Sequence, residues 1–134
     1  VDIADPIEDL STARIAIITT GGIVPVDNPD RIQSASATRW GMYDISSMER
    51  LEAGVFKTIH AGYDPAAADA DPNVCVPLDA LRAYETEGKI KSIDSHFYTT
   101  VGTGTTEAEA SRMAQEMIPI LKEHGVDAVI MTST

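Results

Sequence analysis

Three apolar segments of this 134-residue chain each run into hydroxyl side chains, and glycines follow two of them. If the segments are parallel β-strands, their carboxyl ends meet at the edge of a sheet where α/β proteins bind small molecules. Hydroxyls and free backbone amides at such an edge suit a carboxylate or another small anion. We therefore predict a substrate-binding site here, although each set alone is also typical of an ordinary strand end. Its expected members are Thr19, Thr20, Gly21, Gly22, Thr99, Thr100, Gly102, Thr132, Ser133 and Thr134.

His60 is the histidine best placed for acid–base chemistry, because it leaves a predicted strand and enters a glycine turn. Tyr63 lies in the same turn and is expected to join the substrate site. The alternative is that His60 only hydrogen-bonds its own loop. His96 is expected to pack within a strand, and His124 to interact with the last carbonyls of a helix. The sequence shows no clustered set of metal ligands, so we predict no metal site.

Other reactive motifs are weak. Cys75 is the only cysteine, which excludes an internal disulfide, and we interpret it as a buried, inert thiol because no base or second cysteine accompanies it. Gly102 and Gly104 lack the third glycine of a dinucleotide-binding fingerprint, and the lysine of a phosphate-binding loop is missing. We therefore expect no cofactor on this chain.

Alternating strands and helices must position these residues. Short apolar runs predict strands at residues 13–20, 55–60, 95–101 and 127–134. The stretch 23–49 has little periodicity and is interpreted as a functional loop or a lid. Residues 66–73 are small and acidic, and are expected to form a loop.

Two helices are predicted from their end signals. Pro77 begins the first, and Gly88 follows its last turn. Thr106 and Glu109 form a capping box at the start of the second, and Gly125 ends it. Because helices and strands alternate here, we predict an α/β fold, with an open, mostly parallel sheet covered by helices in a three-layer sandwich.

The ends of the chain suggest that it is part of a longer protein. Residues 1–10 resemble an acidic linker, and residues 11–134 are expected to be the front part of an α/β domain that is incomplete. The final strand delivers hydroxyls to its end with no loop after it, so the chain is interpreted as a fragment. Its apolar residues 129–131 would then be exposed, and we expect self-association.

The composition limits the partners. A formal net charge of −11 would repel the phosphates of nucleic acid and the headgroups of an anionic membrane. No apolar run approaches the roughly 20 residues of a membrane-spanning helix, and no targeting segment is visible. A cytoplasmic location is the expectation.

Several long blocks resemble one family, the selenoprotein subunit of component B of the glycine, sarcosine and betaine reductases. The resemblance runs from about Leu10 to Thr134. The matching blocks are residues 17–25, 28–30, 34–38, 60–65, 77–79, 98–102 and 126–134.

The resemblance implies a mechanism. In that family selenocysteine follows a Thr-Ser-Thr such as residues 132–134, and this chain, which lacks it, is expected to be inactive alone. The selenolate attacks the α-carbon of a small amine-bearing carboxylate, held on the other component B subunit by a pyruvoyl group in glycine reductase. The resulting selenoether passes to the component A selenoprotein, and component C and thioredoxin complete the cycle.

Two other classes are considered. The chain could be a standalone small-anion-binding α/β domain that uses the same edge without covalent chemistry. It could also be a racemase-like α/β enzyme, but those use a cysteine pair, and Cys75 is single and precedes a helix.

Overall fold

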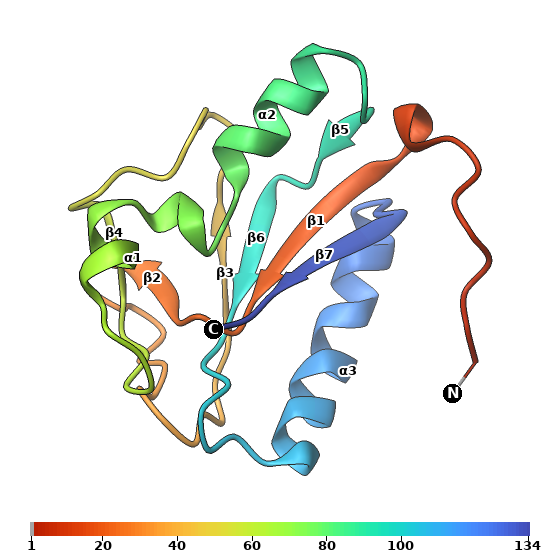
Figure 1. Ribbon diagram of the computed structural model, residues 1–134. Coiled ribbons are helices and arrows are strands. Elements are labelled where there is room, and N and C mark those ends of the chain that lie inside the picture. Colours follow the sequence, from red (N-terminus) through yellow and green to blue (C-terminus); the bar gives the residue numbers. More distant parts are fainter. Residues whose placement is uncertain (1) are drawn as a thin grey trace.

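The computed structural model describes residues 2–134 and shows an α/β fold around a five-stranded sheet (Figure 1). Strand β1 (Arg14–Thr19) is a central strand, and every residue after Arg14 in it is buried. An apolar run of this kind is typical of a parallel sheet that is covered on both faces. The α/β class predicted from the sequence is confirmed.

Strand β1 has partners on both sides. On one side it pairs in parallel with β7 (Ala128–Thr132). On the other, β5 (Ser92–Ile93) pairs with its amino end and β6 (His96–Thr99) with its carboxyl end, again in parallel. Strand β3 (Gly41–Asp44) runs antiparallel to β6. The sheet is therefore mixed but mostly parallel, and β1, β6 and β7 end at the same edge.

Helices lie on both faces of this sheet (Figure 1). Successive side chains of a strand point to opposite faces. Ile18 accordingly packs in the hydrophobic cluster beneath α3 (Glu107–Glu123), whereas Ile17 packs in the one that includes α2 (Leu78–Thr86). Two separate apolar cores thus hold the sheet between helices.

The end signals in the sequence placed both helices correctly. Thr106 caps α3, and its Oγ1 accepts a hydrogen bond from the Glu109 N–H over 3.2 Å. Gly125 follows α3 with a φ of 70°, and Gly88 follows α2 with a φ of 74°. A left-handed residue of this kind is where glycine ends helices at little cost.

Two predictions about loops were wrong. The stretch 23–49 holds β3 and also β2 (Ile23–Pro25), which pairs antiparallel with β4 (Phe56–Thr58) in a second, two-stranded sheet. Residues 66–73 contain the helix α1 (Ala66–Ala70) and the start of the 3₁₀ turn η2 (Pro72–Val74). These elements have only three to five residues, too few to show a hydrophobic period, and tertiary pairing stabilises them.

The amino-terminal region and the last strand are the most exposed parts. Residues 2–9 form no helix or strand and lead into the 3₁₀ turn η1 (Leu10–Thr12). On β7, Val129 is 38%, Ile130 36% and Met131 69% exposed, as predicted. Within residues 2–134, no helix is both long and apolar enough to cross a membrane.

Candidate functional site

The three hydroxyl-bearing strand ends lie side by side, as the sequence predicted. Thr19 is in register with Thr99 of β6 on one side and with Thr132 of β7 on the other. Beyond the strands, the Thr20 N–H donates to the Thr132 carbonyl and the Gly102 N–H to the Thr20 carbonyl, each over 3.0 Å. Main-chain hydrogen bonds therefore hold these loops together at the edge of the sheet.

A cavity of about 360 Å³ opens at this edge. It is lined by Thr20, His60, Gly62, Gly102, Thr103 and Thr134. Apart from His60, none of these described lining residues is titratable. The cavity therefore offers hydroxyls, backbone amides and one imidazole, groups that can donate hydrogen bonds to a small anion without a fixed positive charge.

Four of the predicted threonines point elsewhere. Thr19 Oγ1 is buried and accepts from the Gly21 N–H, while Thr100 Oγ1 donates to the Arg39 carbonyl. Thr132 Oγ1 donates to the Cys75 carbonyl over 2.6 Å. Thr99 Oγ1 is buried with no hydrogen-bond partner among the described residues. These four hydroxyls either form hydrogen bonds within the fold or are buried, and none of them is among the groups that line the cavity.

Of the remaining predicted residues, Thr20, Gly102, Thr134 and His60 line the cavity. Gly22, with a φ of 69°, lies behind them, and a Cβ there would come within 3.0 Å of the His60 backbone nitrogen. Gly62 and Thr103 also line the cavity and were not among the predicted site residues. The turn after His60 and the Gly-Thr-Gly after β6 were the signals that could have indicated both.

His60 lies at the end of the segment that follows β4, and only 8% of it is exposed. Its Nδ1 accepts a hydrogen bond from the Gly62 N–H over 2.9 Å, and its Nε2 lies 3.4 Å from Thr134 Oγ1. Burial lowers the pKa of His60 below the ordinary value of 6.5. The ring is therefore neutral at neutral pH and faces the cavity through Nε2.

Tyr63 packs beside the His60 ring and hydrogen-bonds to the strand end that carries Gly21. Its hydroxyl donates to the Gly21 carbonyl over 2.9 Å and lies 2.8 Å from Thr58 Oγ1. Its ring centroid is 4.9 Å from that of His60. Burial raises the pKa of Tyr63 to about 12, so the hydroxyl keeps its proton. Cys75, which is buried as predicted, lies 3.7 Å from the same hydroxyl.

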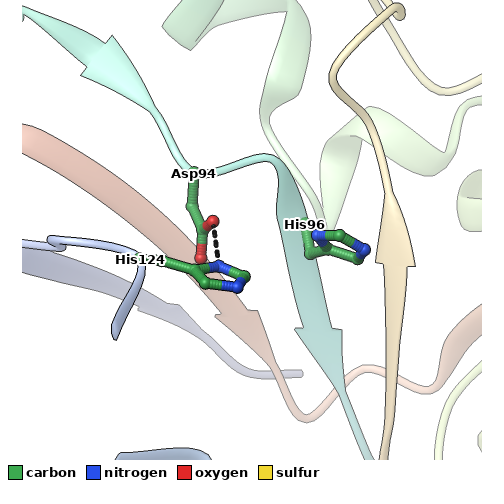
Figure 2. Close-up of side chains that lie close together, drawn as sticks. All are labelled: Asp94, His96 and His124. Carbon is green, nitrogen blue, oxygen red and sulfur yellow. Dashed lines mark hydrogen bonds and ion pairs between the residues drawn. The ribbon is translucent and has the colours of Figure 1, made fainter. Parts of the chain in front are cut away.

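A second polar cluster lies at the opposite, amino-terminal end of β6 (Figure 2). Asp94, His96 and His124 each place a potential metal-ligand atom within 4.8 Å of the others, a grouping not found from the sequence. Asp94 is fully buried, and its carboxylate lies 2.7 Å from His124 Nδ1 and accepts from the Tyr98 hydroxyl over 2.6 Å.

These contacts define the role of the cluster in the fold. The His124 ring meets Asp94, which corrects the expectation that it interacts with the helix carbonyls. Both Asp94 oxygens are engaged within the fold, one by His124 Nδ1 and the other by the Tyr98 hydroxyl. The cluster links the end of α3 to the segment between β5 and β6.

The fold and the cavity define an α/β protein with a candidate small-molecule site at the carboxyl edge of a mostly parallel sheet. Residues 1–134 match the family described as glycine/sarcosine/betaine reductase selenoprotein B, and the chain belongs to this family. The resemblance found from the sequence is thereby confirmed.

Three curated relatives show how the similarity is distributed. The chain is 76% identical over all 134 residues to the betaine reductase complex component B subunit beta of Peptoclostridium acidaminophilum. It is 49% identical over 128 residues, 96% of its length, to the sarcosine reductase complex component B subunit beta of the same organism. Identity is also 49% over 128 residues, 96% of the chain, with the glycine reductase complex component B subunit gamma of Carboxydothermus hydrogenoformans.

The matches cover only part of these relatives. The chain spans 31% of the betaine reductase subunit and 29% of each of the other two. All three are subunits of multi-component reductase complexes, as their names state. No solved structure matches the chain.

Proposed function

We propose that this chain is part of the component B subunit of a reductase complex that cleaves the amine from betaine. The observation that carries the proposal is the 76% identity, over the whole chain, to a betaine reductase subunit, against 49% to the sarcosine and glycine reductase subunits. The reaction class is common to the three, and the higher identity favours betaine among the three substrates.

The cavity at the carboxyl edge is the proposed substrate site. Betaine carries a carboxylate, and the hydroxyls of Thr20, Thr103 and Thr134 offer donors for it. The Gly62 and Gly102 backbones line the same cavity, and the absence of side chains there leaves room for the ligand. The carboxylate is fixed by several neutral donors, so the α-carbon is presented to the nucleophile in one orientation.

The nucleophile is proposed to be a selenocysteine next to Thr134, as the family resemblance implies. Thr134 lines the cavity, so its neighbour in a longer chain would lie at the same edge, beside His60 and Thr20. Such a residue supplies a selenolate at neutral pH, and donors at the end of a strand stabilise a chalcogen anion. The 134 residues by themselves are then inactive.

The partners are proposed on the same basis. They comprise the other subunit of component B, which carries a pyruvoyl group in glycine reductase, and the component A selenoprotein that receives the selenoether. Component C and thioredoxin act downstream, and the complex is expected in the cytoplasm. The three relatives are subunits of reductase complexes, which supports an assembly of this kind.

A substrate comparison tests this function. The full-length protein is assembled with its component B partner, component A and component C, and is given betaine, sarcosine or glycine in separate reactions with a thiol reductant. We expect trimethylamine from betaine, with at most slow release of methylamine or ammonia from the others. Faster cleavage of sarcosine or glycine would overturn the choice of substrate, and no amine from any of them would overturn the function.

A further inference from the structure

The His60 imidazole is held in one tautomer by the main chain. The Gly62 N–H donates to His60 Nδ1 over 2.9 Å. A ring nitrogen that accepts a hydrogen bond presents its lone pair, so the proton of neutral His60 lies on Nε2. A backbone amide is a donor only. The tautomer therefore cannot be reversed by rotating a partner side chain, as a hydroxyl partner would allow.

The short turn from His60 to Gly62 has no room for a side chain at residue 62. A Cβ at residue 62 would lie 2.7 Å from His60 Cε1 and 3.2 Å from the Thr103 Cβ. Only glycine brings its amide this close beneath the ring. The backbone of His60 is also fixed, because its N–H donates to Thr58 Oγ1 over 3.1 Å. Ring orientation and tautomer are thus set together.

The other nitrogen faces the cavity. His60 Nε2 lies 3.4 Å from Thr134 Oγ1, and both residues line the same space. The remaining described lining residues are Thr20, Gly62, Gly102 and Thr103, and none of them has an ionisable side chain. Tyr63, whose ring is tilted by 48° from that of His60, stays protonated. With the proton on Nε2, Thr134 Oγ1 is its acceptor over a long contact of 3.4 Å, which a charged oxygen of a bound molecule can replace.

We propose that His60 is a neutral hydrogen-bond donor that binds the substrate carboxylate through Nε2–H, and is not a general base. The inference rests on the proposed function, in which that carboxylate occupies the cavity. A base at this position would need its free lone pair toward the ligand. The structure instead turns the lone pair of Nδ1 toward the Gly62 amide and the proton of Nε2 toward the ligand.

Two amide variants distinguish these roles. The amide nitrogen of His60→Gln reaches about the position of Nε2 and can donate, whereas that of His60→Asn reaches only the position of Nδ1. In the assembled full-length complex we expect His60→Gln to keep the KM for betaine within about fivefold, and His60→Asn to raise it about 10- to 100-fold, the range for a lost hydrogen bond to a charged group. If His60 were a base, both variants would lose kcat equally.

The tautomer of His60 can also be measured in the wild-type protein, so that the test does not depend on whether a variant folds. Nitrogen NMR of the full-length protein, labelled at histidine, should show the His60 proton on Nε2 at neutral pH, with or without betaine. A proton on Nδ1, or on both nitrogens, would overturn the inference. The two proposals also fail differently: an absence of amine release by the wild-type complex counts against the function, whereas the tautomer is measured without turnover.

Discussion

The Tyr63 hydroxyl donates a hydrogen bond to the Gly21 carbonyl oxygen over 2.9 Å. The two residues lie in turns that follow strands of different sheets. Gly21 follows β1 of the main sheet, and Tyr63 follows β4 of the small one. The hydrogen bond therefore joins the strand end that carries Thr20 to the turn that carries His60, and fixes two walls of the cavity relative to each other.

Removing this hydroxyl should loosen the site. Tyr63→Phe keeps the ring beside His60 but leaves the Gly21 carbonyl without this donor, and we expect a loss of about 1 kcal/mol in the free energy of unfolding. The KM for betaine should rise as well. Urea denaturation and turnover measure the two effects. Tyr43→Phe is the matched control, because its hydroxyl contacts Asp30 away from the cavity and should leave the KM unchanged.

The buried carboxylate of Asp94 should be among the costliest to alter. Asp94→Asn removes the charge opposite His124 and disturbs the bond from the Tyr98 hydroxyl, and we expect a loss of about 3 kcal/mol in the free energy of unfolding. Thermal or urea unfolding measures this. Asp5→Asn, in the exposed amino-terminal segment, should be neutral. Equal stability of the two variants would contradict the structural role assigned to the cluster.

Acidification should lower the free energy of unfolding through His60. Burial lowers its folded-state pKa below 6.5, so the folded state prefers the neutral ring. The stability from this preference is present above pH 6.5 and is lost as the pH falls through the lower, folded-state pKa. His60→Gln cannot titrate. Its free energy of unfolding should therefore fall less than that of the wild type over this range, as unfolding curves at a series of pH values would show.

The exposed face of β7 should drive self-association of the 134-residue chain. Met131 is 69% exposed, and it borders a cavity of about 350 Å³ lined almost wholly by apolar atoms of α3 and the sheet. Met131→Lys should shift sedimentation toward the monomer. Val55→Lys is the control, since Val55 is also exposed, at 51%, but lies outside this face. A wild-type chain that stays monomeric at high concentration would contradict this prediction.

The elements with strong local signals were predictable. The apolar run of β1 requires burial on both faces, and the Thr106–Glu109 pair caps α3 with groups three residues apart. The alternation of strands and helices favoured parallel strands, and parallel β1, β6 and β7 bring their hydroxyl-rich ends to one edge. The end signals of α2 and α3 likewise needed no tertiary contact.

The direction of each hydroxyl was decided only by the tertiary structure. Thr19 and Thr20 are identical and adjacent, yet the first is buried beneath Gly21 and the second lines the cavity. The same holds for Asp94 and His124, which are 30 residues apart. Short strands such as β2 and β3 also form only against distant partners. The sequence thus determined the family, the main strands and helices and the edge where the site lies. Packing decided which side chains face that site, because it depends on contacts between segments far apart in the chain.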